Sequence, residues 1–248
     1  MITKNQIKKI RKLNTKKGRT LFDKYVVEGV KITNEMIKRK IKFHEIYATK
    51  SWLNRHIYLR DKNNVFEVNE KELKNISFLK SPNEVLIILD KVNHHNLNLL
   101  KNESIILAYD RIRDPGNLGT ILRLSDWFGI KNILCSNDSV DVFNPKCIQS
   151  SMGSFLNVNV YYVDLISSFK KLKEYQLIGC NIKGEKLNQM EFPKKFILIF
   201  GSESNGISSV IYKKLEKIVT IPKFSKSKID SLNVASASSI ILSNIFLK

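Results

Sequence analysis

Three polar segments after residue 100, at 110–123, 200–207 and 221–234, contain the residue types that could perform chemistry. Each begins at the end of an apolar run that predicts a buried strand. Ligands of parallel α/β sheets bind beyond the carboxyl ends of the strands. Arg123 could stabilise developing negative charge there, and Glu203 could hold a cation. The three segments therefore predict one site at one edge of a sheet.

The first segment combines a bare glycine with an arginine. Gly119 and Arg123 are four residues apart, so they share one face of the helix predicted from Asn117 to Phe128. A ligand could lie beside the glycine and under the guanidinium group. The structural alternative is that Asn117 is only the N-cap of this helix and that Arg123 is a solvated charge.

The second segment places two glycines around a carboxylate. Gly201 and Gly206 would allow the backbone to approach a ligand closely, with Glu203 between them, and an ordinary turn is the alternative. Neither segment contains the G-x-G-x-x-G or G-x-x-x-x-G-K-[ST] pattern, so Rossmann-type dinucleotide binding and nucleotide hydrolysis lack their usual elements. No histidine follows His95, so this half also lacks the commonest general base.

Alternating strands and helices are expected to position these segments. Strands are predicted at 105–109, 133–135, 158–163, 177–180, 196–200 and 218–221, and helices lie between and after them, the last at 233–247. This order indicates a parallel, two-sided α/β sheet. The N-terminal part predicts a smaller α/β sandwich, with strands at 25–27, 46–48, 65–68 and 84–89 and helices at 7–13, 31–40 and 70–76.

The charge is unevenly distributed along the chain. Lys and Arg number 42 against 23 Asp and Glu, a net charge of +19, and the first 98 residues alone hold 22 basic and 10 acidic residues. Such a surplus predicts a polyanionic partner, above all nucleic acid, with a compositional skew as the alternative. The polar segment 93–101 is the expected linker between a basic domain, residues 1–92, and a second domain, residues 102–248.

Neither a membrane span nor a metal site is expected. No apolar run approaches the ~18 residues of a membrane span, and the basic N-terminus lacks the apolar core of a secretory signal, so a cytoplasmic protein is predicted. Cys135, Cys147 and Cys180 are too widely spaced for a metal knuckle and are expected to be buried thiols. His94 and His95 are adjacent, but the further ligands of a tetrahedral zinc site are missing.

Taken together, the three segments resemble the motifs of SpoU-type (TrmH) RNA methyltransferases of the SPOUT superfamily. The matching patterns are N-x-G-x-x-x-R at 117–123, F-G-S-E-x-x-G at 200–206, and I-P at 221–222 followed by S-L-N-V at 231–234. Their order and separations also match, and 150–154 resembles a further family segment. The N-terminal part, most visibly at 12–19 and 27–31, resembles the family's RNA-binding domain, which shares its fold with some ribosomal proteins.

The resemblance implies a methyltransferase domain whose chain forms a deep trefoil knot, and a homodimer formed through the helices 117–128 and 233–247. It implies S-adenosyl-L-methionine (SAM) as the cofactor and a ribose 2′-hydroxyl of structured RNA as the acceptor. Ribosomal RNA is the expected class. Transfer RNA is an alternative, as is a catalytically silent RNA-binding homologue associated with ribosomes. A small-molecule methyltransferase is disfavoured by the basic N-terminal domain.

Carried over position by position, the motifs imply three groups of residues. The catalytic group is Asn117, Arg123, Glu203, Ser231 and Asn233. The SAM contacts are Phe200, Gly201, Glu203, Gly206, Ile221, Pro222, Leu232 and Asn233. The RNA contacts expected in the basic domain are Lys8, Lys9, Arg11, Lys12, Lys16, Lys17 and Arg19. Two positions depart from the family pattern: Ser204 stands where glycine is frequent, and Ala235 where serine is common.

Overall fold

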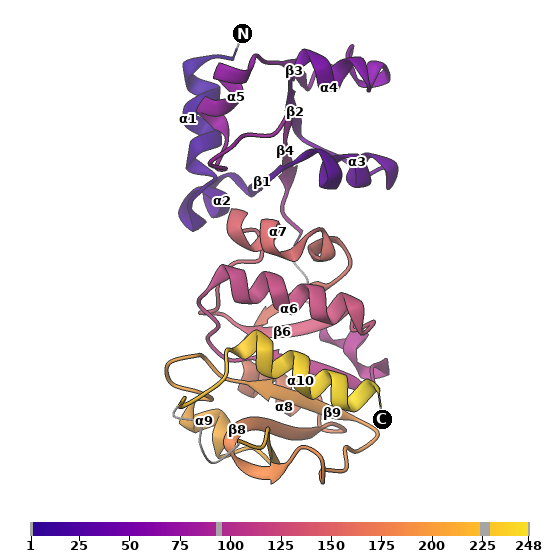
Figure 1. The fold of residues 1–248 in the computed structure, drawn as a ribbon, viewed down its shortest axis with the longest axis vertical. Helices are drawn as coiled ribbons and strands as arrows, with labels where there is room; N and C mark the ends of the chain where they lie inside the picture. The colour runs from indigo at the N-terminus through magenta and orange to yellow at the C-terminus, as the bar shows by residue number, and fades with distance from the viewer. Residues whose placement is uncertain (1, 93–95, 224–228, 248) are drawn as a thin grey trace. The chain divides into compact units, whose positions relative to one another are not determined.

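The computed structural model describes residues 2–92, 96–223 and 229–247. Contacts between residues divide the described chain into two units, drawn in Figure 1. The first unit comprises the residues up to Val92 together with Phe143–Met152, and the second comprises the rest. His94 and His95, the adjacent histidines of the expected linker, lie outside the described residues. The described residues contain no group of three or more His, Cys, Asp or Glu side chains that could hold a metal ion.

The first unit is built on a mixed four-stranded sheet, as the N-terminal apolar runs predict. Its strands lie in the order β1 (Lys24–Glu28), β4 (Val85–Asp90), β2 (Glu45–Ala48) and β3 (Val65–Glu67). β4 runs antiparallel to both of its neighbours, and β2 and β3 are parallel. The helices are α1 (Lys4–Lys12), α2 (Lys16–Phe22), α3 (Val30–Lys38), α4 (Lys50–Asn54), α5 (Glu70–Ile76) and the 3-10 turn η1 (Ile57–Leu59). The short helix α7 (Pro145–Ser151) also belongs to this unit.

The turn between α1 and α2 gives Arg19 a structural role. A side chain at Gly18 would place its Cβ 1.9 Å from the carbonyl oxygen of Lys12, so only glycine permits this close approach. Arg19 is 1% exposed, and its Nη1 donates to the carbonyl oxygens of Leu13 and Asn14 at 3.0 Å each. The prediction of Arg19 as an RNA contact is therefore wrong, because its guanidinium group is buried and binds backbone.

The second unit contains a six-stranded sheet in which every neighbouring pair is parallel. Its order is β10 (Lys217–Thr220), β8 (Gln176–Lys186), β9 (Phe196–Phe200), β5 (Ile105–Tyr109), β6 (Asn132–Ser136) and β7 (Asn159–Val163). The helices are α6 (Pro115–Trp127), α8 (Leu165–Lys171), α9 (Ser209–Tyr212) and α10 (Val234–Phe246), with the 3-10 turns η2 (Leu97–Asn102) and η3 (Ser154–Leu156). The six strands confirm the parallel sheet that the apolar runs predict.

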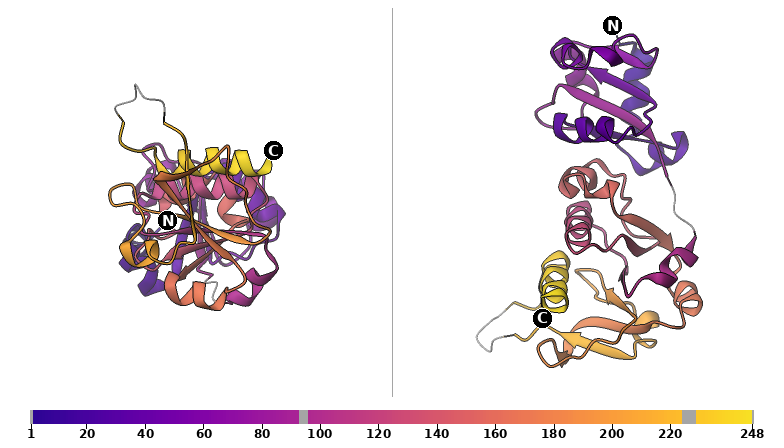
Figure 2. Two further views of the ribbon diagram at one scale, coloured as in Figure 1. Left: turned by 90° about the horizontal axis from the view of Figure 1, so that it is seen from below. Right: turned by 90° about the vertical axis from the view of Figure 1, so that its right-hand side faces the viewer.

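Helices cover both faces of this sheet, as the views in Figure 2 show. One face packs alternate strand residues such as Ile106 and Ile197 against α8, α9 and η2. On the other face α6 and α10 pack against each other. The Tyr109 ring stacks on that of Phe200, 5.3 Å between centroids, and its hydroxyl donates to Ser238 Oγ of α10 at 3.3 Å. This burial raises the pKa of Tyr109, so its hydroxyl keeps its proton and this bond to α10.

The cysteines are free, as expected. Cys135 and Cys147 are buried and Cys180 is half-buried. Burial raises the pKa of the Cys135 thiol to about 12 and also raises the pKa of Cys180, so both stay protonated at neutral pH and are poor nucleophiles. No helix among the described residues is long and apolar enough to cross a membrane.

Candidate active site at the carboxyl edge of the parallel sheet

Three side chains from the three polar segments form one hydrogen-bonded chain in the second unit. Asn117 stands in the first turn of α6, Glu203 follows β9, and Asn233 precedes α10. Asn117 Nδ2 donates to Glu203 Oε1. Asn117 Oδ1 accepts from Asn233 Nδ2 at 2.9 Å. The structure thus brings together three of the five predicted catalytic residues, which are 86 and 116 positions apart in the sequence.

Local structure leaves the Asn117 side chain available for these bonds. The helix α6 begins at Pro115, two residues before its predicted start, and its N-cap is Asp114. Asp114 Oδ1 accepts from the backbone N–H of Asn117 at 2.9 Å. Proline at the first position fits this arrangement, because it has no N–H to satisfy. The alternative interpretation, Asn117 as the N-cap, is therefore wrong.

Asn233 has two roles. Its Oδ1 accepts from the backbone N–H groups of Ala235 at 2.9 Å and Ser236 at 3.3 Å, which caps α10. Its Nδ2 is the donor to Asn117. The cap fixes the amide plane, so the same side chain that starts the last helix also orients Asn117.

The other two predicted catalytic residues are exposed. Arg123 lies on the outer surface of α6, and Ser231 lies just before Asn233. Within the described part of the chain, neither side chain makes a hydrogen bond or an ion pair. Both are accessible to a substrate, and among the described residues no hydrogen bond or ion pair joins them to the Asn117–Glu203–Asn233 chain.

The segment after β9 folds back on itself as a narrow loop. Ser202 N–H donates to the Gly206 carbonyl oxygen at 3.1 Å, and Gly206 N–H donates to the Ser202 carbonyl oxygen at 2.9 Å. A Cβ on Gly201 would lie 1.9 Å from the Gly206 carbonyl carbon, so the loop's own backbone requires this glycine. Gly206 has a φ of +62°, and a Cβ there would meet nothing within 4 Å. Open space for a ligand therefore adjoins Gly206.

The remaining predicted SAM contacts differ in exposure. Phe200 is buried and its ring is committed to Tyr109, so any contact with a ligand falls to its backbone. Ile221 is half-buried and Pro222 is exposed. Leu232 keeps 49% of its surface exposed. Leu232 is therefore free to contact a ligand through its side chain.

Two charged residues at this edge were missed by the sequence analysis. Asp110 and Arg111 directly follow the last residue of β5, and both bind the loop after β9. Asp110 Oδ2 accepts from the backbone N–H of Ser208 at 2.7 Å, and Arg111 Nη2 donates to the carbonyl oxygen of Gly206 at 3.3 Å. The available signal was their place at the end of a buried strand, where ligands of parallel sheets bind.

Replacing Asn233 tests its role as a cap. Asn233→Ala removes the acceptor of two backbone N–H groups and is expected to lower the free energy of unfolding by ~1 kcal/mol. Asn233→Asp keeps the acceptor and should retain most of that stability, although it loses the donor to Asn117. Urea denaturation followed by circular dichroism measures both. Equal losses in the two variants would contradict the capping role.

Comparisons with known proteins agree with this architecture. The SpoU rRNA Methylase family matches residues 104–243, and the MRM3-like substrate binding domain matches residues 4–87. The 23S rRNA (guanosine(2553)-2'-O)-methyltransferase RlmP of Bacillus subtilis is 27% identical over 246 residues, which is 96% of this chain and 95% of that protein.

Solved structures resemble the whole chain. A putative RNA methyltransferase of the TrmH family from Porphyromonas gingivalis is 31% identical, with a TM-score of 0.82 over 98% of each chain. An AdoMet-bound rRNA methyltransferase from Sinorhizobium meliloti has a TM-score of 0.86 at 24% identity, over 98% of this chain and 95% of that one. The second likeness concerns the fold alone.

Proposed function

The chain belongs to the SpoU rRNA methylase family, and we propose that it transfers a methyl group from SAM to a ribose 2′-hydroxyl of ribosomal RNA. The observation that carries this proposal is the hydrogen-bonded chain of Asn117, Glu203 and Asn233. Three separate sequence motifs supply one residue each to this chain. A reaction site needs side chains from distant segments to meet in this way, whereas an ordinary turn does not.

The residues at the sheet edge fit a molecule such as SAM, which is a sulfonium cation with apolar and polar parts. Glu203 supplies a carboxylate, held by Asn117. Leu232 supplies an exposed apolar surface, and the space beside Gly206 is open. With Gly201, Gly206 and Asn233, these residues are the proposed cofactor contacts, together with the backbone of Phe200, Ile221 and Pro222. When bound, SAM supplies an activated methyl group.

Arg123 is proposed to act on the acceptor side of the reaction. A guanidinium group stays protonated in proteins and has no acceptor atom, so it is a poor general base. Its fixed positive charge suits orientation of the RNA phosphate or the hydroxyl, and stabilisation of the oxyanion that develops as the hydroxyl loses its proton. Phosphate or water would accept that proton. Ser231, exposed beside Asn233, is a second candidate to position the ribose.

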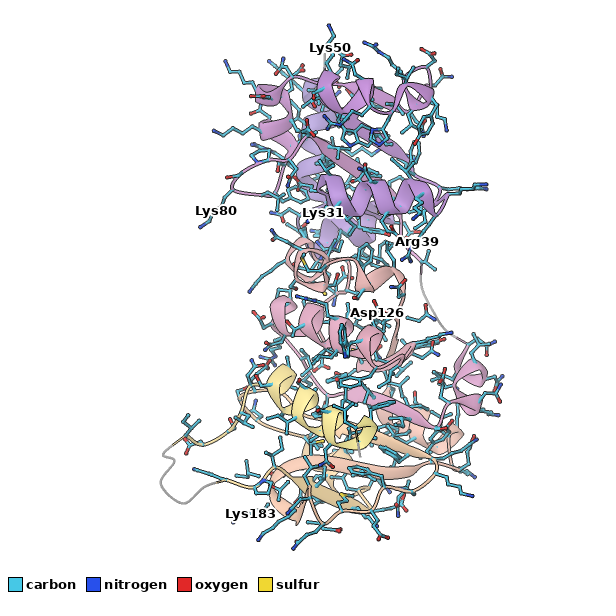
Figure 3. The ribbon with its side chains drawn as sticks, turned by 45° about the vertical axis from the view of Figure 1, so that its right-hand side comes forward. Lys31, Arg39, Lys50, Lys80, Asp126 and Lys183 are labelled. Atoms are coloured by element: carbon cyan, nitrogen blue, oxygen red, sulfur yellow. The ribbon has the colours of Figure 1, made fainter. Side chains whose placement is uncertain are left out.

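The first unit supports an RNA substrate. Lys4, Lys8, Arg11 and Lys12 repeat at helical spacing along α1, which has no acidic residue. They line, with Ile7 and Thr15, a shallow depression of about 580 Å³. Lys16 and Lys17 are exposed and Lys9 is half-buried. Lys50 and Lys80 project outward from the same unit in Figure 3, and Lys31 is also exposed.

The assignment to ribosomal RNA has three rivals. The Bacillus subtilis relative, which spans nearly the whole chain, acts, by its name, on 23S rRNA, and this favours ribosomal over transfer RNA. A catalytically silent RNA-binding homologue would have no chemical need to retain all four of Asn117, Arg123, Glu203 and Asn233. A small-molecule methyltransferase would have no use for the basic stripe on α1. The ribosomal substrate implies action in the cytoplasm.

We further propose two domains, residues 1–92 and 102–248, joined by the segment 93–101, and a trefoil knot in the second. Support for the knot comes from the positions of β10 and of the start of α10. The chain leaves the edge strand β10, yet Asn233 contacts Asn117 of α6 and Ser238 contacts Tyr109 of β5. The start of α10 therefore lies beside the middle of the sheet, although the strand that precedes it is at the edge.

A homodimer is proposed through α6 and α10. These two helices pack against each other, and they leave Trp127, Ile240 and Phe246 exposed at 84%, 41% and 42%. Apolar surface of this kind on neighbouring helices favours burial against another protein surface. A second copy would provide the same surface in return, as two-fold symmetric interfaces do.

The proposed activity is tested by incubating the purified chain with tritiated SAM and either ribosomal RNA, transfer RNA or no RNA. Tritium is expected in 2′-O-methylated nucleosides of ribosomal RNA after complete digestion. Label only in transfer RNA would favour that substrate. RNA binding without any label, in every RNA fraction and in assembling ribosomal particles, would favour the silent homologue and contradict the proposal.

The basic stripe makes a separate prediction about salt dependence. Lys8→Gln with Lys12→Gln is expected to weaken RNA binding and to reduce the slope of log K against log salt by ~0.7 to 0.9 for each phosphate that is no longer bound. Filter binding between 50 and 300 mM salt measures the slope. Lys183→Gln, which removes one exposed lysine from β8, is the control and should leave it nearly unchanged. An unchanged slope in the α1 variant would mean that RNA binds elsewhere.

A further inference from the structure

A charged pair outside the family motifs links the end of β5 to the loop after β9. Asp110 is 3% exposed and its Oδ2 accepts from the Ser208 N–H at 2.7 Å. Its backbone N–H donates to the Phe200 carbonyl oxygen at 2.8 Å. Arg111 Nε lies 3.3 Å from Asp110 Oδ1, and Nη2 donates to the Gly206 carbonyl oxygen at 3.3 Å. The Asp110–Arg111 pair thus holds both ends of residues 201–208.

Arg111 adopts a backbone conformation that side chains disfavour. Its φ is +61°, in the left-handed region, which costs free energy for a residue other than glycine. Its N–H donates to Ser136 Oγ at 2.8 Å, and that hydroxyl also donates to Asp138 Oδ1 at 2.7 Å. The end of β6 therefore holds Arg111 in the strained conformation that lets its side chain reach Gly206.

The side chain of Arg111 is also not fully satisfied. Its Nε is buried and makes no hydrogen bond of good geometry with any described residue, although it lies close to Asp110. A buried donor without a proper acceptor is costly. Strain and an unsatisfied donor at one residue are poor devices for stability alone. Such costs are tolerated at residues that position a functional segment, where the surrounding structure holds the residue in its strained conformation.

We propose that the Asp110–Arg111 pair sets the position of the 201–208 loop and thereby the affinity for SAM, without taking part in methyl transfer itself. This inference rests on the function proposed above, because the loop contains Glu203 and adjoins the open space at Gly206. The pair acts through backbone contacts to Gly206 and Ser208, so both members are positioning residues.

Replacing Arg111 by glycine separates this role from a merely stabilising one. Glycine adopts a φ of about +60° without strain, so Arg111→Gly relieves the backbone while it removes the guanidinium group. We expect SAM to bind about tenfold to a hundredfold more weakly in calorimetry, the scale of a lost charge-assisted hydrogen bond. The melting temperature should not fall below that of the control. The single-turnover rate at saturating SAM should stay within about threefold of the original chain.

Arg113→Gly is the matched control, since Arg113 is an exposed arginine in the same turn. It introduces the same backbone freedom two residues away and should leave SAM affinity unchanged. Asp110→Asn keeps an acceptor for the Ser208 N–H but loses the charge opposite Arg111, so it should weaken SAM binding by less than Arg111→Gly. The double variant with Asp110→Asn and Arg111→Gly should weaken SAM binding by less than the product of the two single effects, because both changes remove the same Asp110–Arg111 interaction.

Hydrogen exchange gives a readout that does not depend on SAM. The N–H groups of Gly206 and Ser208 should exchange faster in Arg111→Gly than in Arg113→Gly in the absence of SAM. Unchanged exchange and unchanged SAM affinity in Arg111→Gly would overturn the inference. The inference would also be overturned if Arg111→Gly lowered both the melting temperature and the single-turnover rate at saturating SAM, because that result would show a general role in stability. An original chain that binds no SAM would instead refute the proposed function, and the inference with it.

Discussion

Replacing Arg123 by alanine is expected to lower methyl transfer to RNA by ~100-fold or more, the usual effect of removing one preorganised charge that stabilises the transition state. SAM affinity should change little, because Arg123 is exposed on α6 and, among the described residues, makes no hydrogen bond or ion pair with Glu203 or Asn233. The free energy of unfolding should also be nearly unchanged, since the exposed side chain has no hydrogen bond or ion pair among the described residues.

The measurement is a single-turnover assay with saturating SAM and ribosomal RNA, combined with calorimetry for SAM. Arg123→Lys keeps a positive charge but cannot donate two parallel hydrogen bonds, so it should recover part of the rate if charge dominates. Lys131→Ala, an exposed cation shortly after α6, is the control for loss of charge in general. An Arg123→Ala variant that keeps nearly full activity would contradict the proposed role.

The sheets could be predicted from the sequence because burial leaves a strong local pattern. Every strand of the parallel sheet contains a run of apolar residues; β9, Phe196–Phe200, is buried throughout. Helix starts were less certain. The stretch Asp114-Pro115-Gly116-Asn117 offers two capping residues, and only the structure shows that Asp114 takes that role. If Asn117 were the N-cap, its side chain would bind the backbone of α6 and would not be available to the site.

The remaining features depend on contacts between distant parts of the chain. The burial of Arg19 follows from the close approach of α1 and α2, which the positive charge of the segment does not reveal. Asp110 binds a backbone N–H 98 positions away. Gly201 was expected to let a ligand approach, whereas the structure shows that the loop's own backbone requires it. The types of residue and their spacing in the sequence identified candidate site residues, but the packing of the loops determines the role of each one.

Disruption of the proposed dimer is the second large effect expected. Trp127→Asp places a charge at a side chain that is 84% exposed on α6, so the fold of one chain should tolerate it. Ile245→Asp places a charge at a half-buried residue of α10 that directly precedes Phe246, whose ring stacks on that of Phe128 with 5.2 Å between centroids. At micromolar concentration the original chain should sediment with a mass near twice 28.7 kDa, and both variants should shift toward a single chain.

Activity should fall together with the mass, because the two helices that would form the interface also carry the site. Asn117 lies in the first turn of α6 and Asn233 caps α10, so losing the interface would loosen the elements that hold both amides. Ile182→Asp changes another exposed apolar residue, 66% exposed on β8, and should alter neither mass nor activity. A fully active original chain that sediments as a single species of one-chain mass would rule out this arrangement. It would also leave the exposed ring of Trp127 to be explained by a partner other than a second copy.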